Sequence, residues 1–206
     1  MRFFSRGEAP RADRLVVGLG NPGEEYARTR HNVGYQVANR LAKRMRAEFK
    51  TKAADARIAE GTLGTMRVAV ARPGTFMNDS GHSVRRLLQR YRLEPKDLVV
   101  VYDDIDLPLG RIRIRPSGGP GTHNGMRSVV AEIESEAFPR VRLGIHQEGD
   151  HGDLVDHVLS PFRDDEAAKA EQMVTRAAES IEVLLRDGIE RAMAKFNADL
   201  VDAADA

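Results

Sequence analysis

The chain has 206 residues, a formal net charge of +1 and 41% hydrophobic residues, which is enough to build one sizeable core in a single domain. It contains no cysteine, and this excludes a disulfide framework and cysteine-ligated zinc sites. No apolar run approaches the ~18 residues of a membrane span, and the start of the chain lacks the long apolar segment of a secretory signal. We therefore expect a cytoplasmic protein with no membrane partner.

Hydrophobic periodicity predicts the elements of the first half of the chain. Apolar residues repeat every four positions from Val33 to Met45, which is typical of a helix buried along one side. A short apolar run before them stops at Asn21, where an Asn-Pro-Gly sequence favours a turn. The expected elements are, in chain order, a flexible arm over 1–13, a buried strand over 15–19, a helix over 31–48, strands over 56–62 and 65–71, and an amphipathic helix over 80–92.

The second half opens with an apolar run over 98–101, which favours a strand in the middle of a sheet covered by helices. Arginine and isoleucine alternate over 111–115, which predicts a strand with Ile112 and Ile114 inward and three arginines outward. A glycine-rich loop, SGGPGTHNG, follows. The remaining expected elements are a helix over 125–133, a strand over 140–145, helical segments over 164–197 with a break at Gly188, and an acidic tail over 198–206.

The order of these elements predicts the fold class. Strands alternate with helices, and the chain contains neither a repeat nor an interdomain linker, which together favour an α/β fold. We expect a single domain over residues 14–197, with a twisted mixed β-sheet covered by helices on both faces.

Gly18, Gly20 and Gly23 match the G-x-G-x-x-G pattern that binds dinucleotides when it follows a strand. In that pattern a helix opens at the glycines, and its N-terminus holds the pyrophosphate. Here Pro22 and Gly23 favour a turn, the long helix is expected only near His31, and no second strand with an acid follows about 20 residues later. The residues therefore disfavour a nucleotide-dependent oxidoreductase.

His31 and Asp103 are the strongest candidates for acid–base chemistry. A histidine at the start of a helix is kept neutral, and so basic, by the positive end of the helix dipole. Asp103 follows the apolar strand, at the edge where open sheets place their sites. A carboxylate there can fix one imidazole tautomer and leave the other nitrogen to deprotonate water. Because the chain has no cysteine and no G-x-S-x-G motif, direct attack by water is simpler than a covalent intermediate.

Other polar clusters offer alternatives. Asp103, Asp104 and Asp106 could hold a metal ion, but no second ligand motif lies near them. Asparagines at positions 21, 78 and 124 fall in predicted loops, where they are either turn residues or amide partners for a neutral polar substrate such as a peptide main chain. A second possible metal set has no recognised spacing and includes glycines that favour a solvated loop; it consists of His146, Asp150, His151, Asp153, Asp156 and His157.

Several motifs occur in one order along the chain, and together they resemble the bacterial-type peptidyl-tRNA hydrolases. The resemblance covers roughly residues 14–197 and is far more specific than any single motif. The motifs are GLGNPGEEYARTRHNVGY, RPGTFMNDSGHSV, VVVYDDIDLPLGRIRIRPSGG, GTHNGMRS, RVRLGI and DHVLSPF.

The resemblance implies an enzyme that hydrolyses the ester between a peptide's last carbonyl and the 3′ ribose of tRNA. Such an enzyme recycles tRNA from prematurely released peptidyl-tRNA and needs no metal or other cofactor. By the same resemblance His31 would activate water, Asp103 would keep His31 in its basic form, and Asn21 would sense the peptide amide. The residues implied to bind the acceptor end and the peptide main chain are Tyr26, Phe76, Asn78 and Asn124.

The arginines between positions 111 and 142 gain a role under this resemblance. Arg111, Arg113, Arg115 and the nearby Arg127 become candidates for contacts to phosphates of the tRNA acceptor stem, which position RNA without reading its sequence. Thr122 stands where many members have glycine, and we expect a local adjustment of the loop there. The resemblance implies a monomer. Its alternative is a catalytically silent RNA-binding relative, which the intact candidate site residues disfavour.

Overall fold

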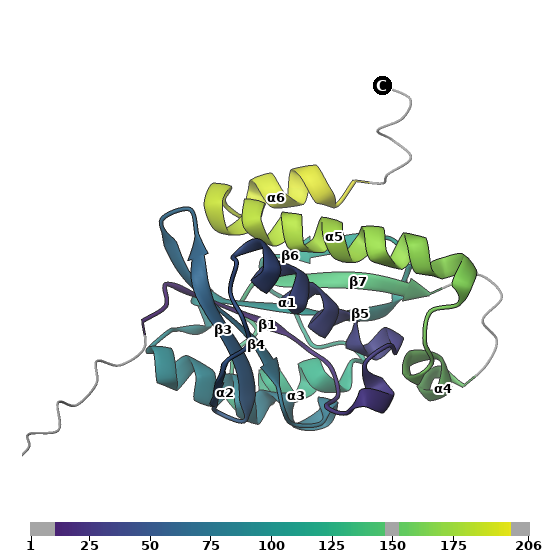
Figure 1. The fold of residues 1–206 in the computed structure, drawn as a ribbon, viewed down its shortest axis with the longest axis horizontal. Helices are drawn as coiled ribbons and strands as arrows, with labels where there is room; N and C mark the ends of the chain where they lie inside the picture. Colours follow the sequence, from purple (N-terminus) through teal and green to yellow (C-terminus); the bar gives the residue numbers. More distant parts are fainter. Residues whose placement is uncertain (1–10, 147–152, 199–206) are drawn as a thin grey trace, which may run out of the picture.

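In the computed structural model, which describes residues 11–146 and 153–198, seven strands form one mixed sheet in the order β2-β3-β4-β1-β5-β7-β6 (Figure 1). β4, β1, β5 and β7 run parallel, and the remaining strands pair antiparallel. The strands are β1 (Arg14–Gly18), β2 (Thr51–Ala53), β3 (Ala56–Leu63), β4 (Met66–Pro73), β5 (Leu98–Pro108), β6 (Ile112–Arg115) and β7 (Arg140–His146).

Helices cover both faces of this sheet, so the predicted fold class is confirmed (Figure 1). One face packs against α1 (Val33–Arg44), α5 (Asp164–Asp187) and α6 (Ile189–Phe196), and the other packs against α2 (Ser80–Tyr91) and α3 (Asn124–Ile133). Successive strand residues point to opposite faces, and each face therefore has its own hydrophobic core. No helix in the described part of the chain is long and apolar enough to cross a membrane.

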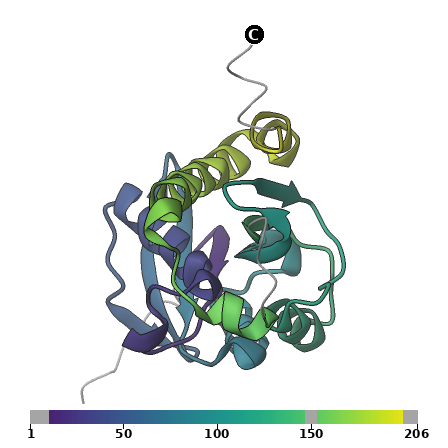
Figure 2. The same ribbon diagram turned by 90° about the vertical axis from the view of Figure 1, so that its right-hand side faces the viewer.

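Short helical turns complete the fold. Among them, η2 and α4 lie in contact at the end of the sheet where β7 finishes, which is the end that faces the viewer in Figure 2. The turns are η1 (Glu24–Tyr26), η2 (Arg30–Asn32), η3 (Met77–Asp79) and η4 (Pro95–Asp97), and the short helix is α4 (Leu154–Leu159).

Several element boundaries differ from the predicted ones. The long helix begins at Val33, because residues 30–32 form the separate turn η2. β5 continues through Asp103 to Pro108, since its polar end still pairs with β7. β2 and α4 were not predicted, and both are short. Gly188 separates α5 from α6 as expected, at a φ of 91°.

The ends of the chain lie mostly outside the described residues. Of the predicted arm, residues 1–10 are not described, and Asp13 already hydrogen-bonds Arg67 at the start of the sheet. Of the predicted acidic tail, only Ala198 is described.

Gly18 of the G-x-G-x-x-G pattern and Gly34 of α1 let α1 pack close to the sheet. A Cβ atom on Gly18 would collide with the backbone of Gly34, and one on Gly34 would meet the backbone of Leu19 and Val101. Gly23 adopts a φ of 117°, a conformation that favours glycine. The glycines therefore bring η2, at the start of α1, to the carboxyl ends of β1 and β5, where the candidate site lies.

Candidate active site

The turn η2 is anchored to the far end of the chain. Its first residue, Arg30, donates its backbone N–H to Ser160 at 2.9 Å, and its side chain also contacts the Ser160 hydroxyl at 2.6 Å. The Arg30 guanidinium forms an ion pair with Glu166 at the start of α5, with an N···O distance of 2.6 Å and both side chains buried. A buried charge is costly without a partner, so this pair fixes the backbone that carries the next residue, His31.

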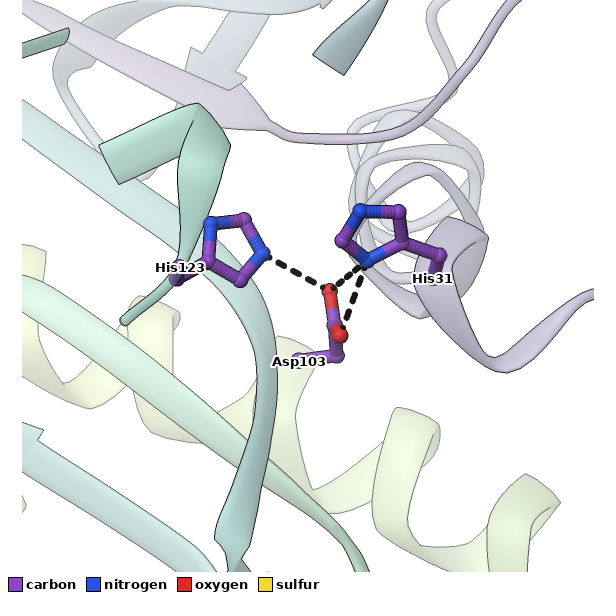
Figure 3. A group of neighbouring side chains, drawn as sticks. All are labelled: His31, Asp103 and His123. Atoms are coloured by element: carbon purple, nitrogen blue, oxygen red, sulfur yellow. Dashed lines mark hydrogen bonds and ion pairs between the residues drawn. The ribbon is translucent and has the colours of Figure 1, made fainter. Parts of the chain in front are cut away.

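His31 and Asp103 meet as predicted from the resemblance (Figure 3). Nδ1 of His31 lies 2.9 Å from each carboxylate oxygen of Asp103, which extends from β5. Asp103 is 3% exposed, and the His31 side chain is 13% exposed. The carboxylate is therefore shielded by the sheet, while the imidazole still reaches the surface.

His123 is a third member of this cluster, and in the sequence only its place in the GTHNG motif points to it. Its Nε2 lies 3.0 Å from Oδ1 of Asp103, opposite His31 (Figure 3). Its Nδ1 accepts a hydrogen bond from the backbone N–H of Met126 and so caps α3. Because Nδ1 accepts, the proton of the neutral ring must sit on Nε2, and His123 donates to Asp103.

The electrostatics of Asp103 follow from this geometry. Burial raises the pKa of the Asp103 carboxyl, but the two imidazoles lower it by more, His123 contributing more than His31, and the net pKa lies well below its ordinary value of 3.8. The carboxylate therefore stays ionised near neutral pH and can only accept hydrogen bonds. It follows that Nδ1 of His31 carries a proton, so the neutral form of this imidazole has its lone pair on Nε2.

Among the described residues, these three side chains are the one group that could hold a metal ion. Their possible ligand atoms lie within 4.8 Å of one another. A metal ion would require a lone pair on Nε2 of His123, and the Met126 hydrogen bond already takes the lone pair on Nδ1. A neutral imidazole has only one such lone pair. The cluster is therefore better suited to a hydrogen-bonded triad than to a metal centre.

The second possible metal set, from His146 to His157, does not form a cluster among its described members. Asp153 caps α4 by accepting from the backbone N–H of Val155, and His157 of α4 lies 3.0 Å from the carbonyl oxygen of Ile145. Residues 150 and 151 of that set lie outside the described residues. These side chains hold α4 at the end of β7.

A cavity of about 580 Å³ opens beside the triad. Its walls come from the carboxyl end of β5, the glycine-rich loop and α4, whose Leu154 and Val155 are among the exposed apolar residues. Arg115 and Arg142 supply positive charge from β6 and β7, and Arg142 is paired with Asp104. The cavity is therefore both apolar and basic, next to a histidine with a free lone pair.

Arg140, which also lies in the arginine-rich stretch over 111–142, is not a surface cation. It is 2% exposed, and its guanidinium donates to backbone carbonyls, among them those of Gly119 and Glu136. A side chain that is so fully engaged supports the glycine-rich loop and does not present a cation to solvent. Ile112 and Ile114 are buried as predicted, while Arg113 is half-buried and Arg115 is exposed.

The remaining predicted site residues come from segments that are far apart in the sequence. Asn21 is buried just beyond β1, and its Oδ1 accepts from the backbone N–H of Met77 in η3 at 2.8 Å. Tyr26 of η1 and Phe76 meet edge to face, with ring centroids 6.4 Å apart, and Phe76 is 55% exposed. Asn78 of η3 and Asn124, the first residue of α3, are exposed on elements that contact each other; Asn124 also lines the cavity.

Comparison with known proteins gives one consistent result. The family model described as Peptidyl-tRNA hydrolase matches residues 15–204. A peptidyl-tRNA hydrolase from Roseiflexus sp. (strain RS-1) is 49% identical over 185 residues, which cover 89% of this chain and 85% of the relative. One from Chloroflexus aurantiacus is 46% identical over 184 residues, covering 89% of this chain and 98% of the relative.

A solved structure agrees with the sequence relatives. The crystal structure of peptidyl-tRNA hydrolase from Acinetobacter baumannii superposes with a TM-score of 0.84 at 32% identity, covering 92% of this chain and 97% of that one. Matches of this coverage and identity, together with the geometry around His31, leave one assignment. The chain belongs to the peptidyl-tRNA hydrolase family.

Proposed function

We propose that this chain hydrolyses the ester bond between the C-terminal carbonyl of a peptide and the 3′ ribose of tRNA, releasing free tRNA and peptide. The observation that carries the proposal is the contact between Nδ1 of His31 and the buried, ionised Asp103, at 2.9 Å. It leaves Nε2 of His31 as an oriented general base at the mouth of a cavity. Family membership supports an enzyme over a silent RNA-binding relative.

The reaction follows from the protonation states. Nε2 of His31 takes a proton from water as the water oxygen bonds to the carbonyl carbon, and Asp103 stabilises the imidazolium that forms. The carbonyl oxygen becomes an oxyanion, which needs hydrogen-bond donors. When the carbon–oxygen bond of the ester breaks, His31 returns the proton to the ribose oxygen. The products are a tRNA with a free 3′ hydroxyl and a peptide carboxylic acid, which releases its proton to solvent and becomes a carboxylate.

We divide substrate recognition between polar and aromatic residues for the peptide and arginines for the tRNA. The amides of Asn78 and Asn124 are suited to a peptide main chain, and the exposed ring of Phe76 beside Tyr26 offers an apolar surface. On the cavity side, Arg115 lies close to Arg113 along β6, and these cations are suited to phosphates of the acceptor stem. We assign the tRNA to the basic side.

The proposal also includes the location of the protein in the cell and its oligomeric state. The substrate of such an enzyme comes from the ribosome, so we place the chain in the cytoplasm. We also propose that it acts as a monomer, because its candidate site is built from described residues of one chain.

The test is turnover of peptidyl-tRNA by wild type, His31→Ala and the control His82→Ala, an exposed histidine on α2. Loss of the general base should lower kcat by about 10²–10⁴-fold, with no change in the thermal unfolding midpoint, while the control should keep wild-type turnover. The assay is repeated with a chelator, which should have no effect. Near-wild-type turnover by His31→Ala would refute the assignment of the base.

A further inference from the structure

Asn32, the last residue of η2, holds the loop that carries Asn21. Its Oδ1 accepts from the backbone N–H of Asn21 at 2.8 Å, and its Nδ2 donates to the backbone carbonyl of the same residue at 2.9 Å. Asn32 is 1% exposed. One amide therefore satisfies both backbone groups of Asn21, and only one orientation of the Asn32 side chain makes both bonds.

The side chain of Asn21 is oriented as well. Its Oδ1 accepts from the backbone N–H of Met77 at 2.8 Å, and a backbone N–H can only donate. The amide of Asn21 must therefore keep its oxygen toward Met77 and its Nδ2 away from it. Among the residues that the structure describes, none accepts a hydrogen bond from this Nδ2.

The location of Asn21 gives this donor a use. β1 and β5 are paired, with Gly18 opposite Val101, so the residues after β1 lie beside the segment of β5 that carries Asp103. Asn21 is 8% exposed, and its Nδ2 is not among the fully buried polar atoms that lack a partner, so its free N–H groups reach the small exposed part of the residue. A pre-oriented, accessible donor that is joined to the turn carrying the general base is suited to the oxygen of a carbonyl on which negative charge develops.

We infer that Asn32 is a positioning residue that makes Asn21 a hydrogen-bond donor to a carbonyl oxygen of the substrate. This inference rests on the proposed function and revises the role implied by resemblance. The bond from Met77 turns the Asn21 oxygen toward η3 and leaves Nδ2 as the group without a partner among the described residues, so Asn21 contacts the peptide through a carbonyl. His31 and Asn32 are neighbours in one turn, so the same backbone fixes the base and, through Asn21, the donor.

The first experiment is a double-mutant cycle on peptidyl-tRNA turnover with Asn21→Ala, Asn32→Ala and the double variant. Loss of the donor in Asn21→Ala should lower kcat about 10²-fold, as removal of one oxyanion donor does. Asn32→Ala should lower kcat about tenfold with little change in KM. The double variant should be no slower than Asn21→Ala, because Asn32 acts through Asn21. Independent, multiplying losses or an unchanged kcat in Asn32→Ala would overturn the inference.

The second experiment tests the polarity of Asn21. Asn21→Asp keeps an oxygen for the Met77 N–H but replaces the free donor by an acceptor. We expect a loss of kcat at least as large as that of Asn21→Ala. Retained turnover would show that the residue accepts from the substrate and would overturn the inference.

Two controls keep these results interpretable. Asn39→Ala removes an exposed asparagine of α1 whose side chain bonds only Arg72 among the described residues, and it should turn over as wild type. If Asn32→Ala does not fold, Asn32→Asp keeps the acceptor for the Asn21 N–H and replaces the donor to the Asn21 carbonyl by a carboxylate oxygen. It should then lower kcat in the wild-type background and have no further effect in Asn21→Ala. Failure of wild type to cleave the ester would refute the proposed function itself, which is a separate outcome.

Discussion

Two segments converge on Asp103 from opposite sides, and they are held in different ways. On one side, η2 binds Glu166, Asp103 and the loop of Asn21 through three consecutive side chains. On the other side, the glycine-rich loop over 117–123 is held largely through its backbone carbonyls, which accept from the guanidinium of Arg140. Side-chain anchoring specifies η2 residue by residue, whereas the loop before His123 needs only a main chain of suitable path.

This difference explains why Thr122 is tolerated in the loop. The left-handed conformations there fall on Gly118 and Gly121, and Thr122 is not among the non-glycine residues with positive φ. Its side chain is exposed. A β-branched residue at this position therefore meets neither backbone strain nor a steric clash with a buried neighbour.

We expect the largest loss of kcat from Asp103→Asn, because η2 and the glycine-rich loop both bind this carboxylate. An asparagine amide can donate to Nδ1 of His31, and the proton would then move to Nε2, which could no longer act as a base. We expect kcat to fall by about 10²–10⁴-fold, the range of general base catalysis. Steady-state turnover checks this, with the exposed Asp106→Asn as the control. Equal rates for the two variants would contradict the role of Asp103.

The second largest effect is expected on the free energy of unfolding, when the ion pair that anchors η2 is broken. Glu166→Gln removes the charge that compensates the buried Arg30, and breaking such a pair costs about 3–5 kcal/mol. The control on the same helix is Glu171→Gln, whose partner Arg40 is near the surface and whose side chain is 60% exposed; its loss should cost less than about 1 kcal/mol. Denaturant unfolding measures both. A similar cost for the two variants would mean that η2 does not depend on this ion pair.

Removal of His123, in the glycine-rich loop, should change the pH dependence of kcat/KM. His123 lowers the pKa of Asp103, so its removal raises that pKa and makes the carboxylate a better partner for protonated His31. The acid limb of kcat/KM should therefore move to higher pH in both His123→Ala and His123→Asn.

The two His123 variants separate this effect from helix capping. Asparagine can still cap α3, whereas alanine cannot, so only His123→Ala should lose about 1 kcal/mol of stability. A shift of the acid limb in the alanine variant alone would assign it to the cap and not to the contact with Asp103.

The smallest effect concerns the basic edge of the cavity. Arg113→Ala combined with Arg115→Ala should reduce the slope of log affinity for tRNA against log salt by about 1.5, if each cation meets one phosphate. Binding of uncleaved tRNA at several salt concentrations measures the slope. The same loss of charge on the far helices, in Arg186→Ala combined with Arg191→Ala, should leave the slope unchanged, and equal slopes for the two pairs would count against this face.

Local patterns explain what was predictable from the sequence. Period-two alternation placed Ile112 and Ile114 inward, and continuous apolar runs located β1 and the first half of β5. The burial of polar residues was not predictable in this way. Arg30 is buried because Glu166 meets it from 136 residues away, and no short window of sequence contains both.

In the candidate site, too, local motifs were predictable and contacts between distant residues were not. Motifs found His31 and Asp103, which the structure brings together, whereas the contact of His123 with Asp103 depends on the path of a loop between them. α4 was missed because it is short and its apolar side chains face a cavity, which leaves no buried stripe for periodicity to reveal. The roles of Tyr26 and Phe76 stay predictions.

The three contacts of η2 also have a consequence for folding. They close chain segments of 11, 72 and 136 residues, so one three-residue turn depends on the docking of elements from both ends of the domain. Contacts of such long sequence separation are entropically expensive and form late. After refolding, esterase activity should therefore recover later than helical content. The return of activity then reports when α5 has docked against η2.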